Sequence, residues 1–400
     1  MQIFSKVPFI LILILFKINM NNFKKIRFND FIKLNRGFDL PSEKIVEGII
    51  PVVTSSDIKS YHLNYKVLGP GVITGRSGTL GIVQYVDENY WPHNTTLYVK
   101  DFKGNLPKFV YYFLKTMHLE NFNAGVGVPT LNQNHLHNQK IFIPSLPIQQ
   151  KIASILSSYD ELIENNKQRI QLLEEMAEEI YKEWFVRLRF PGYETTKIVD
   201  GLPEGWEVKK LGDILETVKR KPKISTDKYL LEGIYPIIDQ GDDFIAGYTN
   251  DKNFVQFEPL PLLVFGDHTR RVKFVNYPFA SGADGTQLLS PSNKNLLPIY
   301  FYIMVKNIDL SNFHYARHFK FLKQEFIVIP DNKNLKKYNE LVISFYDEIQ
   351  ILKDKNQLLQ ETRDLLLPRL ISGKLSVAHL VEEELGMVAE ERAEYKKTLK

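Results

Sequence analysis

The sequence contains no cysteine, which excludes a disulfide scaffold, a cysteine-ligated zinc or iron–sulfur site and a thiol nucleophile. Tryptophan is scarce, with three residues against 20 tyrosines and 26 phenylalanines. Of the 400 residues, 44% are hydrophobic and 24% are charged, which excludes a mostly disordered or low-complexity chain. A chain of this length has room for about two to three domains, and its net charge of +4 permits an anionic partner without requiring one.

The sequence also lacks the usual catalytic and nucleotide-binding motifs. The segment 373–375 does not have the spacing of a phosphate-binding loop, and the glycines at 69–71 and 125–127 do not form a dinucleotide-binding turn. His135 and His137 are two positions apart, without the carboxylate pattern of a zinc site. We therefore expect no catalytic residue, no metal and no cofactor in this chain.

A short apolar run stands near the N-terminus. Val7–Phe16 is uncharged and lies between Lys6 and Lys17, but it is shorter than the roughly 20 residues of a membrane span. No small-residue cleavage site follows it, so we interpret residues 1–20 as an extension from a translation start upstream of Met20. The alternative is a secretory signal or a membrane anchor.

The chain contains an internal repeat with a long period. Val72–Gly75 corresponds to Leu263–Gly266, 191 positions later, and Lys140–Pro144 corresponds to Phe326–Pro330, 186 positions later. Each half contains short apolar runs bounded by glycine and proline, as in strands, and an aromatic run with helical spacing that we expect to be buried. A helical segment follows each half, so the repeat predicts a mixed α/β (α+β) protein in the order globular, helix, globular, helix.

These patterns predict the following domain organisation. We expect an N-terminal extension (1–20), a first globular domain (21–147), a central helical region (148–189), a linker (190–200), a second globular domain (201–330), a distal helical region (331–376) and a tail (377–400). We expect Pro368 to end the regular distal helix near Leu367.

Both helical regions carry an apolar heptad stripe, which predicts that they pair as an antiparallel coiled coil with pseudo-twofold symmetry. The numbers of facing residues then share the sum 522, so that Asn166 meets Asn356 and Arg363 faces Tyr159. The alternative is that each helix packs only on its own globular half. The predicted interface residues are Ile152, Leu156, Ile163, Asn166, Ile170 and Leu173 in the first helix and Val342, Phe345, Ile349, Leu352, Asn356 and Leu359 in the second.

Polar and basic residues at corresponding places in both halves are candidates for binding DNA. Lysine and arginine neutralise phosphates, whereas arginine, asparagine and glutamine in loops can read base edges. Any single candidate can instead be a solvated or helix-capping residue. The candidates are Thr54, Ser55, Ser56, Arg76, Ser77, Asn94, Thr95, Thr96, Asn132 and Gln133 in the first half and Lys219, Arg220, Lys221, His268, Thr269, Arg270, Arg271, Asp284, Arg317, His318 and Lys320 in the second.

The polar residues differ between the halves although the apolar frame repeats. Arg76 and Ser77 fall opposite Asp267 and His268, as expected for readers of two different targets. Seven short segments, taken together, are specific enough to indicate a protein family: Pro51–Ile58, Gly69–Gly81, Trp91–Val99, Val128–Asn132, Ile143–Lys151, Leu202–Asp213 and Leu367–Gly373. In these segments the sequence resembles the DNA specificity subunits of type I restriction–modification systems, over roughly residues 23 to 376.

The resemblance implies two target-recognition domains separated by two antiparallel helical regions. It implies a non-catalytic, cytoplasmic subunit that recognises a bipartite target in double-stranded DNA. The expected partners are two methyltransferase subunits and restriction/translocase subunits, which would use S-adenosylmethionine, ATP and Mg. The alternative function is a membrane-tethered coiled-coil interaction protein, and the missing motifs argue against an enzyme in its own right.

Overall fold

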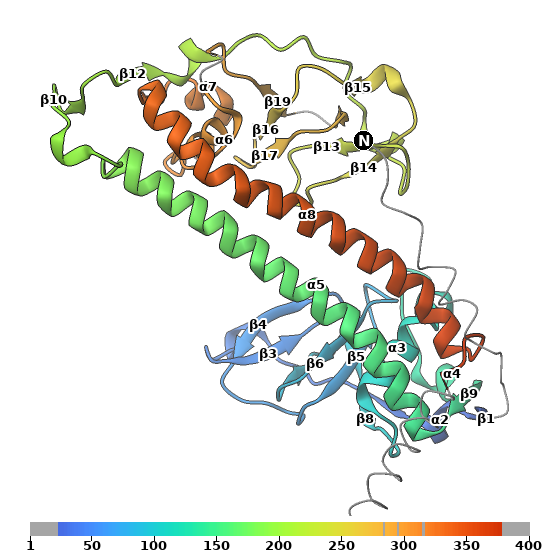
Figure 1. Ribbon diagram of the computed structural model, residues 1–400. Coiled ribbons are helices and arrows are strands. Elements are labelled where there is room, and N and C mark those ends of the chain that lie inside the picture. The colour runs from blue at the N-terminus through green and yellow to red at the C-terminus, as the bar shows by residue number, and fades with distance from the viewer. Residues whose placement is uncertain (1–22, 283–284, 294–295, 314–316, 378–400) are drawn as a thin grey trace, which may run out of the picture. The chain divides into compact units, whose positions relative to one another are not determined.

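The computed structural model describes residues 23–282, 285–293, 296–313 and 317–377 (Figure 1). The chain divides into two compact units. The first runs to Asn166 and resumes at Asp354, and the second spans Lys167–Lys353. Both boundaries fall inside long helices, so each unit contains sheets and a part of each helix. The N-terminal extension and the tail beyond Val377 lie outside the described residues.

The first unit contains a four-stranded sheet, a three-stranded sheet and a two-stranded pair. The strands are β1 (Phe23–Arg27), β2 (Lys33–Arg36), β3 (Ile50–Val53), β4 (Ile58–His62), β5 (Gly71–Gly75), β6 (Val83–Val86), β7 (Trp91–Pro92), β8 (Thr96–Asp101) and β9 (Lys140–Pro144). Their orders are β2-β8-β5-β6, β4-β3-β7 and β1-β9. β5 is buried along its whole length, which is typical of an apolar run at the centre of a sheet.

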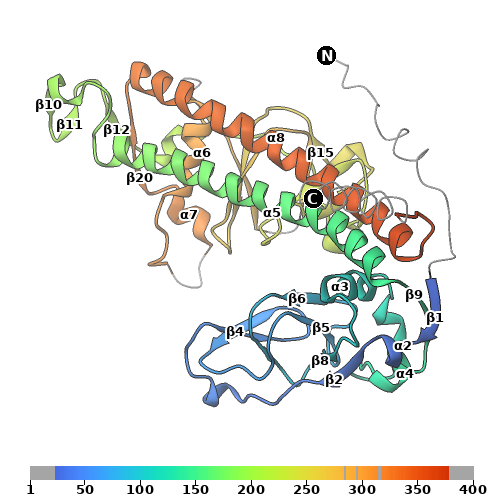
Figure 2. The same ribbon diagram turned by 60° about the horizontal axis from the view of Figure 1, so that its bottom comes forward.

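Short helices cover the sheets of the first unit. They are α2 (Phe28–Phe31), α3 (Pro107–Lys115) and α4 (Gln133–His137). Figure 2 shows α3 between the four-stranded sheet and the start of the long helix α5 (Leu146–Tyr181). Phe109, Val110 and Tyr112 of α3 are fully buried, which confirms that the first aromatic run packs inside.

The second unit repeats this plan. Its strands are β10 (Ile198–Val199), β11 (Leu202–Pro203), β12 (Glu207–Lys210), β13 (Tyr235–Ile238), β14 (Gly247–Thr249), β15 (Val255–Gln256), β16 (Leu262–Gly266), β17 (Val272–Val275), β18 (Phe279–Ser281), β19 (Thr286–Leu289) and β20 (Phe326–Ile329), and its short helices are α6 (Pro298–Lys306) and α7 (His318–Leu322). The sheet orders are β14-β13-β18-β15, β17-β16-β19, β12-β20 and β10-β11.

The two units share strand directions as well as strand order. β3 pairs antiparallel with β4 and parallel with β7, and β13 pairs antiparallel with β14 and parallel with β18. β5 lies between antiparallel β6 and β8, as β16 does between β17 and β19. The register also matches, because Gly75 pairs with Thr96 and Gly266 pairs with Thr286. The sequence repeat is therefore a repeat of topology, and the architecture is mixed α/β.

The long helices α5 and α8 (Asn332–Ile371) pack together antiparallel within each unit (Figure 1). A short π-helix, η4 (Lys182–Val186), continues α5. Each helix also contributes to the core of a globular part: Ile152 and Leu156 join Leu370 in the first unit, and Ala177 joins Tyr338 in the second. The sequence left two packing modes open, pairing of the two helices and packing of each helix on its own globular half. The structure contains both.

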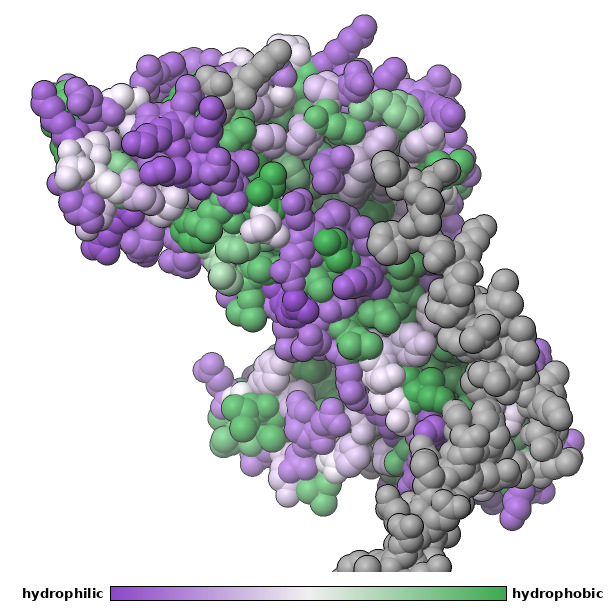
Figure 3. All heavy atoms as spheres, in the orientation of Figure 1, coloured by the Kyte–Doolittle hydropathy of each residue, from purple (hydrophilic) through white to green (hydrophobic). Residues whose placement is uncertain are grey.

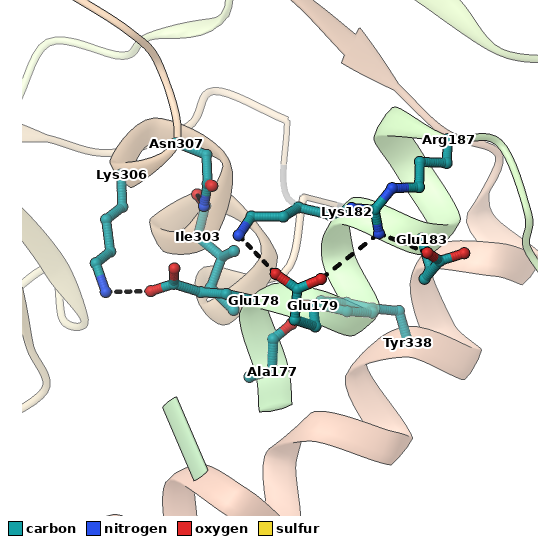
Figure 4. Close-up of polar contacts among 10 residues, drawn as sticks. All are labelled: Ala177, Glu178, Glu179, Lys182, Glu183, Arg187, Ile303, Lys306, Asn307 and Tyr338. Carbon is teal, nitrogen blue, oxygen red and sulfur yellow. Dashed lines mark hydrogen bonds and ion pairs between the residues drawn. The ribbon is translucent and has the colours of Figure 1, made fainter. Parts of the chain in front are cut away.

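In the second unit, α6 and α8 contact the same turn of α5 (Figure 4). The Tyr338 hydroxyl of α8 donates to the Ala177 carbonyl at 3.0 Å, and Lys306 of α6 forms an ion pair with Glu178. On the solvent side, Glu179 pairs with Lys182 at 2.7 Å. One side of this turn of α5 thus contacts α6 and α8, and the other side faces water.

The exposed faces of the long helices are mostly polar, with single apolar residues interspersed (Figure 3). The predicted interface residues of both stripes are all buried or half-buried. The exposed apolar side chains of α8 are not among the predicted interface residues; they are Leu341, Ile343, Ile351, Leu358 and Leu365.

In the first unit the two stripe asparagines meet. Asn166 Nδ2 donates to Asn356 Oδ1 at 2.8 Å, and Asn356 Nδ2 donates to the Ile163 carbonyl at 3.4 Å. Only 9% and 8% of Asn166 and Asn356 are exposed, so the amides are buried as well as paired. This is the contact that the sum of 522 predicts.

The charged contact of Arg363 is with Asp160, the residue next to the predicted partner Tyr159. Its guanidinium binds the Asp160 carboxylate at 2.6 Å, and the other oxygen of Asp160 accepts from the Tyr112 hydroxyl at 2.6 Å. Burial alone would lower the pKa of the Arg363 guanidinium, but the hydrogen bonds that it donates to Asp160 and Asp364 outweigh burial and raise the pKa. An arginine in an apolar stripe is thus stabilised by the neighbouring carboxylate.

The prediction that Pro368 ends the helix near Leu367 is wrong, because α8 continues to Ile371. Proline removes the bond to the preceding turn, but the following turn still closes: Ser372 N donates to the Pro368 carbonyl at 3.1 Å. The chain leaves the helix at Gly373, whose φ of +73° suits glycine.

Replacing one stripe asparagine should destabilise the first unit more than replacing both. Asn166→Leu leaves the Asn356 amide buried without its side-chain partner, which costs about 1–3 kcal/mol, whereas the double Asn→Leu variant restores an apolar layer. Urea unfolding of the two single variants and the double variant measures the coupling. We also propose that the asparagine pair fixes the register of the two helices. Positions 163 and 359 face each other in this register, because their numbers sum to 522. Cysteines introduced there should form a single disulfide in the parent, whereas the double Asn→Leu variant should lose this specific cross-link. Additive effects of the two substitutions would contradict the pairing.

Candidate nucleic-acid interface

Four loops of the first unit come together at the ends of β3, β5 and β7. The main chain of the β5–β6 loop binds the β7–β8 turn: the amides of Arg76 and Ser77 donate to the Thr95 carbonyl at 2.8 and 3.1 Å. The Arg76 carbonyl in turn accepts from Leu131 N at 2.8 Å, which brings in the segment before α4. The structure therefore places Arg76, Ser77, Asn94, Thr95 and Asn132 around one site.

The loop after β3 completes this cluster. A Cβ at Gly75 would lie 3.3 Å from the Ser55 Cβ and 1.8 Å from the Thr79 carbonyl oxygen, so only glycine fits between the loops. The Thr54 main-chain carbonyl accepts from Gln84 Nε2 at 2.7 Å, and the Thr54 hydroxyl donates to the Asp57 carboxylate at 2.7 Å. Thr54 and Ser55 are half-buried in these contacts, while Ser56 is exposed.

One predicted contact in the first unit needs correction, and a second side chain has one of its polar atoms engaged within the protein. Thr96 is fully buried, and its hydroxyl donates to the His93 carbonyl at 2.7 Å, so its side chain supports the turn and is not available to a ligand. Asn132 is exposed, but its carboxamide oxygen accepts from Asn134 N at 2.9 Å and caps α4. Gln133 is half-buried in the first turn of that helix.

In the second unit the β16–β17 loop is the centre of a corresponding cluster. The Gln240 carbonyl accepts from the Thr269 hydroxyl at 2.7 Å, and the Gln240 side chain accepts from His268 N at 3.1 Å. A Cβ at Gly285 would lie 2.8 Å from the His268 ring. Arg220 reaches the same region, because it donates to the Thr286 carbonyl at 3.2 Å and to Gln287 Oε1 at 2.8 Å.

The remaining basic candidates of the second unit lie on the surface. Arg270 is exposed with a φ of +61°, and its guanidinium donates to the Leu310 carbonyl at 3.1 Å. Arg271 is exposed and forms an ion pair with Asp242. Asp284 lies outside the described residues. The other exposed basic candidates are Lys219, Lys221, Arg317 and Lys320.

The structure does not support a direct ligand contact for His318. Only 5% of the residue is exposed, and its ring nitrogens lie 2.9 Å from the Asp267 carbonyl and 2.8 Å from the Phe313 carbonyl. Asp267 is also buried, and its carboxylate accepts from Phe319 N at 2.7 Å at the start of α7. These two residues hold the loop in place.

The same backbone bridge closes both clusters. Leu131 N donates to the Arg76 carbonyl at 2.8 Å in the first unit, and His318 N donates to the Asp267 carbonyl at 2.9 Å in the second. Arg76 and Asp267 therefore occupy equivalent positions, but one presents a half-exposed guanidinium and the other a buried carboxyl group. A repeated frame with different side chains is suited to binding two different sequences of one polymer.

The family model of the type I restriction modification DNA specificity domain matches the chain twice, at residues 20–175 and 203–361. The chain belongs to this family. It is thus a DNA specificity subunit of a type I restriction–modification system, the non-catalytic component of such complexes.

This specificity subunit matches one relative over most of its length, another over about a quarter, and a solved structure in its fold. The type I restriction enzyme MjaIX specificity subunit of Methanocaldococcus jannaschii is 26% identical over 399 residues, covering 86% of this chain and 91% of the relative. The MjaVIII specificity subunit of the same organism is 33% identical over 104 residues, 26% of this chain and 24% of that protein. A crystal structure of the S subunit from M. genitalium has a TM-score of 0.57 and 19% identity, and the match covers 89% of this chain and 98% of that one.

No helix among the described residues of the specificity subunit is long and apolar enough to span a membrane. The run at 7–16, on which the membrane-tether alternative depends, lies outside the described part of the chain. The described residues also contain no cluster of three or more histidine and acidic side chains that could hold a metal ion.

The structure adds site residues that the sequence did not single out. Burial lowers the pKa of the Arg76 guanidinium, and the positive charge of nearby Arg36 lowers it further. The negative charge of Asp39 acts in the opposite direction and raises it. Asp39 also binds Asn94. Neither residue lies in the segments that were matched between the two halves. Gln240 could have been found, since it follows β13 as Thr54 and Ser55 follow β3.

Proposed function

We propose that this specificity subunit recognises double-stranded DNA in two halves, one through the loop cluster of each unit. The observation that most strongly supports the proposal is the common backbone bridge at Arg76 and Asp267, which carries different side chains in the two clusters. Arginine at one position can donate two hydrogen bonds to guanine, whereas the other cluster offers Gln240 and His268. Two equivalent frames with different chemistry fit a bipartite, asymmetric target.

We further propose that the catalytic steps belong to partner subunits. The family places the chain in a type I restriction–modification assembly that acts on DNA. In our proposal, two methyltransferase subunits use S-adenosylmethionine to methylate adenines, and restriction/translocase subunits use ATP and Mg. The specificity subunit binds none of these cofactors itself and works in the cytoplasm, where such an assembly meets DNA.

Substitution of one arginine in each cluster tests this division. Arg76→Ala should relax selectivity in one half of the target and Arg270→Ala in the other, each by about 1–3 kcal/mol of discrimination. Mapping methylated adenines genome-wide, in cells with each variant and in cells without the gene, measures the sequence preference of both halves. Arg369→Ala, an exposed arginine on α8, is the matched control and should change neither half.

Two results would contradict the proposal. Equal weakening on every sequence would mark the arginines as phosphate contacts, which position a protein without specifying bases. Relaxation of the same half by both substitutions would mean that the two units do not read separate halves.

A further inference from the structure

The β7–β8 turn of the first unit has a tightly fixed backbone. His93 N donates to the Val53 carbonyl at 2.9 Å, and the His93 carbonyl accepts from Thr96 N at 3.0 Å. Arg76 holds the middle of the turn, because its Nε donates to the Asn94 carbonyl at 3.0 Å. Asn94 is therefore presented from a rigid support, which is the condition for a polar side chain to discriminate between similar ligands.

The side chain of Asn94 is fixed as well. Its Nδ2 donates to the Asp39 carboxylate, and Asp39 forms an ion pair with Arg36 at 3.6 Å. A carboxylate can only accept hydrogen bonds, so it determines which end of the Asn94 amide is the nitrogen. Asp39 itself is 70% exposed and Asn94 beside it is half-buried, so both side chains reach the surface.

This orientation leaves one N–H and the carbonyl oxygen of the Asn94 amide for a ligand. In the major groove, adenine presents a donor at N6 next to an acceptor at N7, which complements that pair. Guanine presents two acceptors, so one of them would oppose the Asn94 oxygen, and cytosine offers only the N4 donor. Resting on the proposed function, we propose that Asn94 reads an adenine in the half-site of the first unit, and that Asp39 is the positioning residue that orients its amide.

Competition binding of the full-length chain to duplexes tests the assignment. Each duplex carries the mapped target with one base pair changed. Asn94→Ala should reduce the preference for adenine at one position of one half by about 5- to 150-fold and leave the other positions unchanged. Asn94→Asp combined with Asp39→Asn exchanges the acceptor and the donor of this pair, so the new carboxylate at position 94 keeps a hydrogen bond and should shift the preference to cytosine, whose N4 donates. Asn138→Ala, an exposed asparagine after α4, is the control and should change nothing.

Asp39 is tested by a conservative and a non-conservative variant. Asp39→Ala should lower the preference at the same position as Asn94→Ala, whereas Asp39→Asn should retain part of it, since a carboxamide oxygen accepts from Nδ2 but the amide can also turn and donate to Oδ1. A loss in both variants that is equal for every sequence would overturn the positioning role. The assignment of Asn94 fails if Asn94→Ala weakens all sequences equally or changes the preference for another base, even when Arg76→Ala still relaxes one half. The proposed function fails separately, if Arg76→Ala and Arg270→Ala do not divide the halves.

Discussion

Exchanging residues 21–147 for the corresponding domain of another specificity subunit is expected to replace one half of the recognised sequence and leave the other half unchanged. All four loops of the first cluster lie within this segment, on β3, β5, the β7–β8 turn and the segment before α4. The loops of the second cluster lie on β13, β16 and β19, outside the exchanged segment. Mapping of methylated adenines with the chimaera and with the parent measures the outcome.

The exchanged domain must also fit the helices of its unit. Tyr112 donates to Asp160, and Gln149 at the start of α5 binds Leu106 N at 3.1 Å and Asn105 Oδ1 at 2.8 Å. The donor domain should therefore be chosen with a tyrosine at the place of Tyr112. A second chimaera with phenylalanine there is a matched control that reports on stability alone. A simultaneous change of both halves in the stable chimaera would exclude independent readers.

Features that follow from local periodicity could be predicted from the sequence. Strand runs such as Gly71–Gly75 and Leu262–Gly266 carry their own apolar pattern, and the repeat made their equivalence visible. The heptad stripes likewise determined a register, because a buried amide is stabilised only opposite another polar group. Asn166 and Asn356 meet for this reason.

Features that depend on residues distant in sequence could not be predicted in the same way. Thr96 and His318 are polar residues of the kind that bind a ligand from a loop, yet both are buried, Thr96 at the start of β8 and His318 at the start of α7. Asp39 and Asn94 are 55 positions apart, and no spacing rule connects them. Arg363 violated the apolar stripe, and its partner Asp160 lies next to the stripe instead of in it. Residue type identified the loops of the site, but only the fold shows which side chains remain accessible.

Asp331 organises the junction between the second globular part and α8. Its Oδ1 accepts from Lys333 N at 2.9 Å and from Asn334 N at 3.0 Å, which caps the start of the helix. Its Oδ2 accepts from Trp206 Nε1 at 2.8 Å and from Asn334 Nδ2 at 2.6 Å. Trp206 is 7% exposed, so its indole N–H depends on this carboxylate.

Asp331→Ala is expected to destabilise the second unit by about 2–4 kcal/mol, since it removes a helix cap and leaves the buried Trp206 N–H unpaired. Urea unfolding at neutral pH, followed by tryptophan fluorescence, measures the loss. Asp347→Ala, at an exposed position of α8 in the same unit, is the matched control and should unfold like the parent. A loss below about 0.5 kcal/mol would show that the four hydrogen bonds contribute little to stability.

The same carboxylate should make the second unit sensitive to acid. Burial alone would raise the pKa of Asp331, but the hydrogen bonds from Asn334, Trp206 and Lys333 outweigh it and lower the pKa. A lowered pKa in the folded state gives stability that is fully present above the unfolded pKa of about 3.9 and is lost as the pH falls through the folded value. Asp331→Asn cannot titrate, so the difference in free energy of unfolding between parent and variant should shrink as the pH falls from about 5 to below 3. A difference that stays constant over this range would mean that ionisation of Asp331 does not couple to folding.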